Sequence, residues 1–506
     1  MTRLTSIMDD SIRIYPEYEL LFFEERTYTN LDAFRRGCRL GNALLALGLQ
    51  PGDILLAHME NCPDAMHLLA ACAKTGIIFC PTMFLLSAEE LSWIAGHSRA
   101  AYLVTTPNLL SKVRLACPEM FERGRVIMAG GSPEPGTIDL EEICAEQSDE
   151  LATSPDLSDD DVAALLYTAG TTGRPKGVLL THGNLGSNVR ALAYTTRITR
   201  DEVALSSLPL SHSYGLTTAL LPAVCGLSSI LMRWFSPAEV FAYTERFHVR
   251  SIAGVPAMFI QLLNHPRAPQ YNVRSWKRLQ SGAAPLPDEV LKAFRDKFGV
   301  NLYEGYGLTE AAPVVSCQSP HLPFKPGSVG PPLDGIEVRI RDEFERELPP
   351  GSPGEITVRG LSVMKGYLDD PEQTERALRA GWLHTGDIGY LDEDGYLFIV
   401  ERKKDLIISG GFNLYPSEVE EVLARHPAVA ESAVVGEPDP IRGEVVHAFV
   451  VLNEGMEVTE RELMDFARGS LVYYKCPHHV TFLDELPHTF LGKPSRRDLR
   501  DRLTRR

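Results

Sequence analysis

The segment that most constrains the fold runs from Val162 to Val178, where a short apolar run is followed by a loop rich in glycine, threonine and cations. The run from Val162 to Tyr167 carries no charge and follows an acidic break, so it is predicted to be a buried strand. Glycine lets a backbone turn sharply against an anion, and threonine hydroxyls and cations add donors and positive charge. The loop is therefore predicted to hold phosphates through Thr168, Gly170, Thr171, Thr172, Gly173 and Lys176.

This loop differs from the Walker phosphate loop, in which Ser or Thr follows the lysine, because Pro175 precedes Lys176 and Gly177 follows it. An ordinary turn between strand and helix is the alternative, but such a turn needs only one or two glycines. The segment 167–177 closely resembles the phosphate loop of the adenylate-forming enzymes. That superfamily includes acyl-CoA synthetases, the adenylation domains of peptide synthetases, and luciferases.

Composition limits the class of protein. A chain of 506 residues, 44% hydrophobic and 23% charged, is typical of a soluble protein with about three domains or subdomains. The net charge of −17 argues against nucleic-acid binding, so a phosphate ligand needs local positive charge. The nine cysteines include no C-x-x-C pair and are interpreted as buried thiols in a reducing cytosol. With no signal peptide and no run of 18 apolar residues, we expect a cytoplasmic monomer or homodimer without a transmembrane segment.

The pattern along the chain predicts an α/β fold. Up to about residue 320, strands alternate with helices of about a dozen residues, which predicts parallel sheets covered by helices. From Gly327, short strands separated by Gly and Pro predict a small β-barrel-like part over about 327–402. We therefore expect a large N-terminal domain over 1–402 and a small mobile α+β C-terminal domain over 403–506. The charged connector between them predicts a hinge at about Lys404.

The segment 301–310 matches the Tyr-Gly-x-Thr-Glu motif of the same superfamily. Tyr306 offers a flat face to adenine, and Thr309 offers a hydroxyl to the phosphate that stays in the product. Glu310 offers a hard oxygen ligand to Mg²⁺. A glycine-rich turn after a strand is the alternative, and the phosphate loop upstream favours nucleotide binding.

A carboxylate follows a tight turn in the segment 382–387. In the superfamily this aspartate, here Asp387, binds both ribose hydroxyls, which two carboxylate oxygens suit. Arg402 matches the arginine that also reaches the ribose. An aspartate in a turn is more often a cap, and only the matched spacing to Arg402 favours a ligand. Glu401 stands where the family usually has glycine, a difference that concerns the local backbone shape.

The C-terminal region carries two further motifs. The segment 487–493 resembles the one with the catalytic lysine of adenylation, which implies that Lys493 neutralises charge at the α-phosphate. A solvated basic tail is the alternative. The segment 407–416 resembles the loop that lines the pantetheine tunnel after the small domain rotates, and Gly410 and Gly411 suit a thin tunnel. A plain hairpin is the alternative there.

Two segments resemble the substrate side of the family's site. The segment 210–216 aligns with a motif that places His212 against the acyl carboxylate or at the thiol tunnel. A lone histidine is more often structural, but the motif favours a functional one. Relatives that activate amino acids have an aspartate here, so a plain carboxylic acid is favoured. The segment 281–286 resembles the one whose backbone lines the adenine and acyl sites, which implies contacts from Gly282 and Ala283.

The pair His478–His479 is the remaining candidate for metal or catalytic chemistry. No further ligand spacing supports a metal site, and adjacent residues of a strand point to opposite faces. The pair is therefore interpreted as structural.

The motifs occur in family order from about residue 20, and the resemblance implies an AMP-forming acyl-CoA synthetase. A carboxylic acid would attack Mg-ATP to give acyl-AMP and pyrophosphate, and the small domain would then swing so that CoA takes the acyl group. The expected ligands are ATP, Mg²⁺, CoA as co-substrate and a small carboxylic acid, with a medium- or long-chain fatty acid favoured. An aryl acid, an acyl carrier protein as acceptor and a non-catalytic nucleotide sensor stay open as alternatives.

Overall fold

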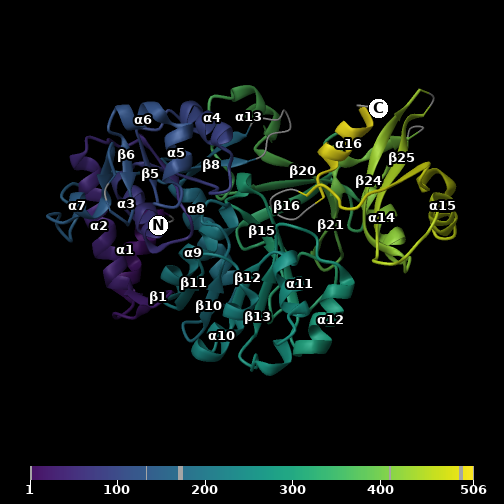
Figure 1. Ribbon diagram of the computed structural model, residues 1–506, viewed down its shortest axis with the longest axis horizontal. Coiled ribbons are helices and arrows are strands. Elements are labelled where there is room, and N and C mark those ends of the chain that lie inside the picture. Colours follow the sequence, from purple (N-terminus) through teal and green to yellow (C-terminus); the bar gives the residue numbers. More distant parts are fainter. Residues whose placement is uncertain are drawn as a thin grey trace. The chain divides into compact units, whose positions relative to one another are not determined.

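The computed structural model describes residues 3–132, 134–168, 175–409, 412–440, 442–488 and 494–504 (Figure 1). Its contacts divide the chain into two compact units. The first comprises Met1–Val338 and Val358–His384, and the second comprises Arg339–Thr357 and Thr385–Arg506. Each unit has hydrophobic clusters of its own.

One sheet of the first unit contains the predicted strand before the phosphate loop. Its strands are β3 (Ile54–His58), β4 (Ile78–Thr82), β5 (Tyr102–Thr105), β6 (Val126–Met128), β7 (Thr137–Asp139), β8 (Val162–Thr168), β9 (Lys176–Thr181) and β18 (Gly366–Tyr367). The helices of this region are α2 (Asn30–Ala46), α3 (Pro63–Thr75), α4 (Ala88–Ser98), α5 (Leu110–Ala116), α6 (Pro118–Glu122) and α7 (Leu140–Cys144).

The strand order in this sheet is β18-β9-β8-β4-β3-β5-β6-β7. Strands β3 to β8 pair in parallel, whereas β9 and β18 are added antiparallel beyond β8. Apolar side chains of α4 and α5 pack on one face of the parallel strands (Figure 1). Strands β8 and β9 pair antiparallel, with Thr168 opposite Lys176, so the two ends of the glycine-rich segment lie next to each other.

A second eight-stranded sheet of the first unit carries the Tyr-Gly-x-Thr-Glu motif. Its strands are β1 (Glu19–Phe23), β2 (Arg26–Thr29), β10 (Val203–Ser206), β11 (Ser228–Leu231), β12 (Ser251–Gly254), β13 (Arg278–Ser281), β14 (Leu302–Gly307) and β15 (Val314–Cys317). The helices are α1 (Leu4–Ile14), α8 (His182–Thr196), α9 (Ser213–Cys225), α10 (Pro237–Phe247), α11 (Pro256–Asn264) and α12 (Asp288–Phe298), with short 3₁₀ turns η1 (Ala268–Gln270) and η2 (Thr309–Ala311).

The order in the second sheet is β15-β14-β13-β12-β10-β11-β1-β2. The six inner strands, β14, β13, β12, β10, β11 and β1, pair in parallel. The two edge strands, β2 and β15, pair antiparallel with β1 and β14. The buried rings of Phe241, Trp276 and Phe294 join α10 and α12 to one face of the sheet. In parallel sheets the functional residues gather at the carboxyl ends of the strands, which is where β13 and β14 end in Ser281 and Gly307.

The β-rich part forms a five-stranded sheet in the order β16-β17-β20-β19, with β21 also paired to β20. Its elements are β16 (Ile336–Arg341), β17 (Gly354–Gly360), α13 (Pro371–Ala377), β19 (Leu378–Arg379), β20 (Trp382–Leu391) and β21 (Leu397–Arg402). The pairs of β20 with β19 and β21 are antiparallel, as short strands separated by Gly and Pro predict.

The C-terminal part is an α+β body within the second unit. Its elements are η3 (Lys403–Asp405), β22 (Ile407–Ser409), β23 (Phe412–Leu414), α14 (Pro416–Ala424), β24 (Val429–Asp439), β25 (Gly443–Leu452), α15 (Glu460–Arg468), η4 (Tyr473–Lys475), β26 (His479–Phe482) and α16 (Arg496–Thr504). The sheet order is β23-β22-β25-β24, with β26 beside β25. Alternating side chains of β24 and β25 bury one face under α14 and α15 and the other under α16.

These observations confirm the predicted α/β fold class, with parallel-rich sheets, a small β-rich part and a C-terminal α+β body. All nine cysteines are free, and eight of them are buried, as expected for thiols without disulfides. Among the described helices, none has the length and apolar character needed to cross a bilayer. The domain boundary at residue 402 and the hinge at about Lys404 stay predictions.

Candidate active site

The phosphate loop is framed by two strands of the first unit. Thr168 at the end of β8 is the register partner of Lys176 at the start of β9, so a hydroxyl and a cation lie side by side at its base. The preceding Tyr167 is anchored by a hydrogen bond between its hydroxyl and His97 Nδ1, 2.8 Å long. The predicted phosphate ligands Gly170, Thr171, Thr172 and Gly173 lie outside the described residues.

Glu310, the predicted Mg²⁺ ligand, is linked to the base of that loop through Tyr367. The Tyr367 hydroxyl donates to Glu310 Oε1 over 2.9 Å, and Lys176 Nζ lies 5.3 Å from the centre of the Tyr367 ring. Burial raises the pKa of the Tyr367 hydroxyl and the neighbouring Glu310 carboxylate raises it further, so Tyr367 stays a neutral donor. An acidic oxygen and a cation of the phosphate loop thus flank one tyrosine.

Two asparagines of α8 hold the segments that carry Glu310 and Tyr367. Asn188 Nδ2 donates to the backbone oxygen of Val314 over 2.8 Å, and its Oδ1 accepts from the Val314 N–H over 3.2 Å. Asn184 Nδ2 donates to the backbone oxygens of Leu361 and Val363 over 2.7 and 2.8 Å. Because residues four apart share one face of a helix, α8 fixes both segments from one side.

Thr309 and His212 both lie near the first residues of α9. The Thr309 hydroxyl lies 3.2 Å from the hydroxyl of Ser213, and both side chains are buried. His212 is the N-cap of α9, and its Nδ1 accepts from the Tyr214 N–H over 3.2 Å. The helix can begin here because Gly215 lies against the preceding backbone, where an added Cβ would be 2.1 Å from the Pro209 oxygen. His212 therefore has a structural role in addition to the functional role predicted for it.

The adenine-side residues lie at the carboxyl ends of β13 and β14. Tyr306 is half-buried and pairs with Ser316 across the antiparallel edge. Gly282 lies against the ring of Tyr214, since a Cβ at Gly282 would be 3.2 Å from Tyr214 Cε1. Ala283 has a φ of +66°, a left-handed conformation that costs energy for a residue with a side chain. The structure thus brings the predicted Gly282, Ala283 and Tyr306 to neighbouring strand ends.

The two residues predicted to bind the ribose, Asp387 and Arg402, meet in the second unit. They are register partners on β20 and β21, and Arg402 Nε lies 2.8 Å from Asp387 Oδ1. Asp387 is almost fully buried, whereas about half of the Arg402 side chain is exposed. The turn before Asp387 is held by Glu355, whose Oε1 accepts from the Gly386 N–H and whose Oε2 pairs with Lys403 Nζ at 3.0 Å.

Glu401, which replaces the usual glycine, is built into a buried ion-pair network. Its Oε1 accepts from Arg496 over 2.9 Å, and its Oε2 accepts from the Ser417 N–H over 3.1 Å. Arg496 also pairs with Glu420 at 2.8 Å. Burial alone would lower the pKa of Arg496, but Glu420 and Glu401 outweigh it and raise the pKa, so the guanidinium stays charged. The Glu401 substitution is therefore compensated by α16 and α14.

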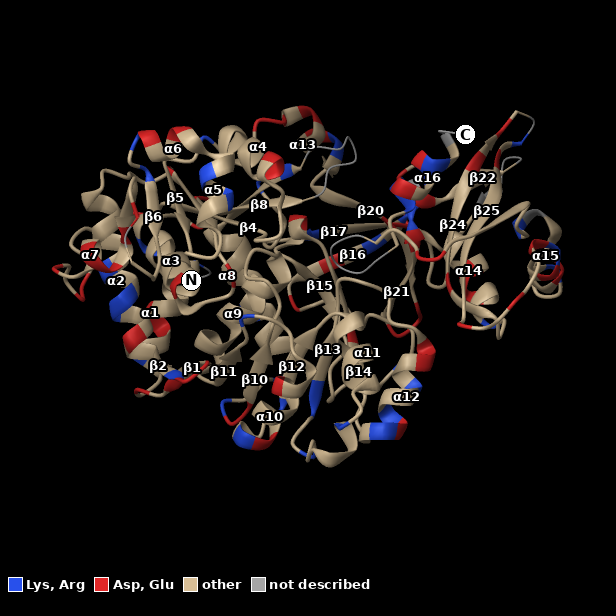
Figure 2. Ribbon diagram, viewed as in Figure 1, with Lys and Arg blue, Asp and Glu red and all other residues tan. Residues whose placement is uncertain are grey.

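The rest of the predicted site lies outside the described residues. This applies to Gly410 and Gly411 of the predicted tunnel loop, to Lys493, and to the side chain of the predicted hinge residue Lys404. Figure 2 shows Lys and Arg interspersed with Asp and Glu over the helices and loops. Positive charge is therefore distributed over individual residues and does not form one large basic face in this view.

Comparisons with known proteins agree with this geometry. A family model described as AMP-binding enzyme matches residues 8–368, and one described as AMP-binding enzyme C-terminal domain matches 418–493. A feruloyl-CoA synthase from Amycolatopsis sp is 39% identical over 94% of each chain. A long-chain-fatty-acid–CoA ligase from Bacillus subtilis is 36% identical over 98% of this chain and 94% of the relative.

Solved structures show the same fold over the same length. ATP-bound MatB from Rhodopseudomonas palustris has a TM-score of 0.91 at 32% identity, over 98% of each chain. O-succinylbenzoate coenzyme A synthetase (MenE) from Bacillus subtilis, in complex with ATP and magnesium ion, has a TM-score of 0.84 at 32% identity, over 98% of this chain and 99% of that one.

The fold and the grouped residues are thus those of an adenylate-forming enzyme. The chain belongs to the AMP-binding enzyme family, as an ATP-dependent, AMP-forming acid–CoA ligase. The sensor and carrier-protein alternatives are therefore not favoured.

Sequence reasoning missed Tyr367, Asn184, Asn188 and Glu355. Tyr367 contacts Glu310 and Glu355 contacts Gly386, and both partners are distant in the chain. No local sequence pattern indicates these contacts. The two asparagines did leave a signal, because buried amides four residues apart on an apolar helix need partners outside the helix.

Proposed function

We propose that this ligase activates a hydrophobic carboxylic acid as its acyl-adenylate and then transfers the acyl group to the thiol of CoA. The observation that supports this most strongly is the row formed by Glu310, Tyr367 and Lys176, which offers an acidic oxygen, a neutral donor and a cation at the base of a phosphate loop. Such a row suits a triphosphate, whose charge must be compensated at several points along its length.

In the first step, a carboxylate oxygen of the acid forms a bond to the α-phosphorus, and the bond from that phosphorus to the oxygen bridging to the β-phosphorus breaks. Lys176, Thr168 and residues 170–173 would hold the departing β- and γ-phosphates. Glu310 fits a Mg²⁺ ligand, because the Tyr367 hydroxyl fixes one carboxylate oxygen and the donor type is the hard oxygen that Mg²⁺ prefers. When bound, Mg²⁺ neutralises charge on the phosphates.

The AMP half would be held by the remaining residues that match the family's motifs. Tyr306 would lie on adenine, with the backbone of Gly282 and Ala283 beside it. Asp387 would accept hydrogen bonds from the ribose hydroxyls while its other oxygen is oriented by Arg402. Thr309 would donate to the phosphate that stays in the product, and Lys493 would stabilise the charge that develops as pyrophosphate leaves.

In the second step, the CoA thiol attacks the acyl carbon, and the bond between that carbon and the AMP oxygen breaks. We propose that the C-terminal domain turns about Lys404, which withdraws Lys493 and brings Gly410 and Gly411 to the pantetheine. His212 would orient the carboxylate in the first step or border the thiol path in the second. Its Nδ1 is occupied by the Tyr214 N–H, so Nε2 would be the interacting nitrogen.

The acid is proposed to lack an ammonium group, because the segment 210–216 offers no carboxylate to pair with one. A medium- or long-chain fatty acid is the first candidate, supported by the ligase from Bacillus subtilis. An aryl acid is the second, supported by the feruloyl-CoA synthase and by the flat Tyr214 ring beside Gly282. A flat ring next to a small residue suits a planar substrate by stacking.

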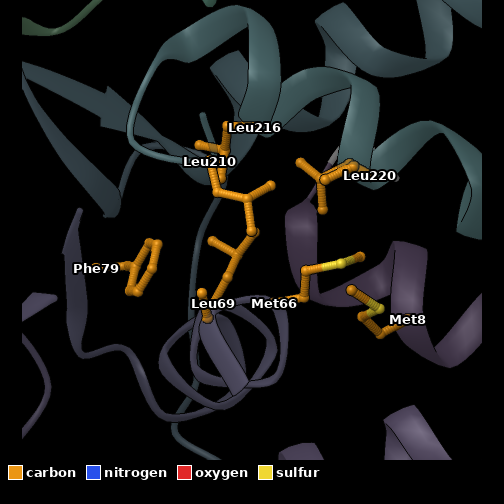
Figure 3. A pocket seen from close by; sticks show the side chains of 9 residues that line it. Met8, Met66, Leu69, Phe79, Leu210, Leu216 and Leu220 are labelled. Atoms are coloured by element: carbon orange, nitrogen blue, oxygen red, sulfur yellow. The ribbon is translucent and has the colours of Figure 1, made fainter. Parts of the chain in front are cut away.

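One apolar cavity of the first unit does not suit a long acyl chain. It is lined mainly by Met8, Met66, Leu69, Phe79 and Leu220 (Figure 3). The cavity has roughly room for one water molecule. It is therefore a packing defect beneath α9, and we place the acid on the side of Tyr214 and Gly282 instead.

The test is an end-point assay that detects acyl-CoA by mass from one acid at a time, with ATP, Mg²⁺ and CoA. The panel contains hexanoate, decanoate, palmitate, benzoate, 4-coumarate and ferulate. The pair 3-phenylpropanoate and phenylalanine has the same skeleton with and without the ammonium. We expect product from at least one hydrophobic acid and none from phenylalanine. Product from phenylalanine or only from small polar acids would contradict the proposed substrate class.

A further inference from the structure

Three metal-binding side chains meet on one face of the C-terminal sheet, in the second unit. Glu437 lies on β24, His447 on β25 and His479 on β26. His447 Nδ1 lies 2.7 Å and His479 Nδ1 lies 2.5 Å from the same oxygen, Glu437 Oε2. All three donor atoms lie within 4.8 Å of one another.

The strand register brings this group together. His447 and His479 are direct partners in the parallel pair of β25 and β26. Val435 is the partner of His447 in the antiparallel pair, so Glu437, two residues further along β24, lies on the same face. The group therefore lies on three neighbouring strands, with His479 opposite His447 and Glu437 diagonal to it, and its geometry is set by the sheet.

His447 is held in place before any ligand arrives. Its side chain is 4% exposed, and its second nitrogen, Nε2, lies 2.9 Å from the Thr481 hydroxyl. The ring also stacks on Phe449, with 4.6 Å between ring centres. A hydrogen bond to the far nitrogen is the usual way in which a protein fixes the tautomer and orientation of a metal-binding histidine.

One side of the group is open to solvent. The His479 side chain is 55% exposed and Glu437 is 29% exposed, so an ion could enter from that side and keep water as a further ligand. In a tetrahedral site with bonds of 2.0–2.1 Å, neighbouring donors lie about 3.3 Å apart. The two N–O distances would need to lengthen by less than about 1 Å, which the exposed His479 ring can provide by rotation.

The pair His478–His479, interpreted as structural from the sequence, has two different surroundings in the structure. The two rings do have different partners, since His478 Nε2 lies 2.5 Å from Arg442 while His479 meets Glu437. The missing ligands of His479 lie on β24 and β25, far away in the chain, so no local spacing marked them. A guanidinium beside His478 disfavours a cation there, and this makes His478 a matched control.

We propose that Glu437, His447 and His479 form a binding site for a divalent transition metal of the zinc class, separate from the Mg²⁺ of the ligase reaction. Two imidazoles and one carboxylate suit Zn²⁺, Co²⁺ or Ni²⁺, whereas Mg²⁺ prefers an octahedral shell of oxygen atoms. A bound ion ties three strands of the C-terminal body at one point, on the face that also carries α16.

The test is a calorimetric titration of ZnCl₂ into the full-length, EDTA-treated protein at pH 7.5, with millimolar Mg²⁺ present throughout. We expect about one tight Zn²⁺ per chain, and visible absorption bands when Co²⁺ is added in its place. The variants His479→Asn and Glu437→Gln should each weaken Zn²⁺ binding at least tenfold. The control His478→Asn should leave the affinity unchanged. The nine cysteines compete little, since eight are buried.

Circular dichroism on each variant separates lost binding from lost folding. The proposal is wrong if Zn²⁺ binds the wild-type protein no more tightly than it binds the two site variants. It is also wrong if His478→Asn weakens Zn²⁺ binding as much as His479→Asn does. A wild-type protein that binds no stoichiometric Zn²⁺ would leave the group as a hydrogen-bonded His–Glu–His cluster only, and would equally overturn the metal site.

Discussion

Polar contacts orient the charged groups of the proposed nucleotide site. Glu310 is held by the Tyr367 hydroxyl, and Asp387 is held by Arg402 Nε. Each carboxylate thus keeps a defined orientation before the nucleotide binds. Orientation of this kind lowers the cost of reaching the transition state, because the groups need not reorganise during the reaction.

The substitution Tyr367→Phe tests this at the Glu310 carboxylate. A hydrogen bond to a charged group contributes about 1.5–3 kcal/mol, so we expect kcat/KM for ATP to fall about 10- to 100-fold. The measurement is the rate of acid-dependent pyrophosphate release over a range of ATP concentrations. Tyr102→Phe is the control, because it removes a hydroxyl that donates to the Leu47 oxygen instead. Equal rates of pyrophosphate release for Tyr367→Phe and wild type would show that the Tyr367 hydroxyl does not contribute to the reaction.

Glu304, two residues before Tyr306, makes stability depend on pH. Burial raises the pKa of its carboxyl from 4.5 to about 7, and Asp288 adds to the rise. The folded protein therefore keeps a proton that the unfolded chain loses above about pH 4.5. As the pH rises from about 4.5 to about 7, this group destabilises the folded state progressively.

We therefore expect Glu304→Gln to raise the melting temperature at pH 8 and to have little effect near pH 5. The full difference corresponds to about 3 kcal/mol, from 1.36 kcal/mol per pKa unit. Thermal unfolding at both pH values measures it, with Glu289→Gln as an exposed control nearby. The same shift at both pH values would show that Glu304 is not proton-linked to folding.

At the scale of elements, α8 positions two distant segments of the site. Its Asn188 satisfies both backbone groups of Val314, next to η2, and its Asn184 holds the segment before Tyr367. A helix is a stiff support for such contacts, so the spacing of Glu310 and Tyr367 depends on it.

The substitution Asn188→Ala leaves the buried N–H and oxygen of Val314 without this partner, at a cost of about 1–3 kcal/mol each. We expect lower thermal stability and at least a tenfold loss of adenylation, because the η2 turn loses its support. Circular dichroism melting and pyrophosphate release measure the two effects. Ser187→Ala, on the same turn of α8, is the control. Full activity in Asn188→Ala would show that the η2 turn keeps its conformation without Asn188.

The sequence predicted elements whose information is local. Strand β8 follows from an uncharged apolar run, which is a property of neighbouring residues alone. Asp387 and Arg402 were both proposed as ribose ligands from a motif spacing, and the structure places them 2.8 Å apart. Tyr367 and the group around Glu437 were missed because their partners are set by strand register, which the sequence does not show. Helix α1 was also missed, although it buries Leu4 and Ile7.

At the scale of the whole molecule, the chain forms two units with separate cores, and residues assigned to the proposed reaction occur in each unit. Tyr306, Thr309 and Glu310 belong to the first, and Asp387 and Arg402 belong to the second. A chain arranged in this way can use one site for two half-reactions if part of it turns between them.

Lys493→Ala and Lys404→Pro should separate these half-reactions. We expect Lys493→Ala to lose adenylation and to keep thioester formation from supplied acyl-AMP. Lys404→Pro should do the reverse, because proline fixes φ where the chain must turn. The controls are Arg497→Ala, an exposed cation on α16, and Lys404→Ala, which keeps backbone freedom. Equal loss of both half-reactions in either variant would contradict the proposed rotation.

The central claim is that this site joins a hydrophobic acid to AMP. The most direct measurement is ATP–pyrophosphate exchange by the full-length protein with each acid of the panel, without CoA. The account predicts exchange that requires both Mg²⁺ and a hydrophobic acid and that falls at least 100-fold in Glu310→Gln. Absence of exchange with every acid, or exchange that Glu310→Gln leaves unchanged, would contradict it.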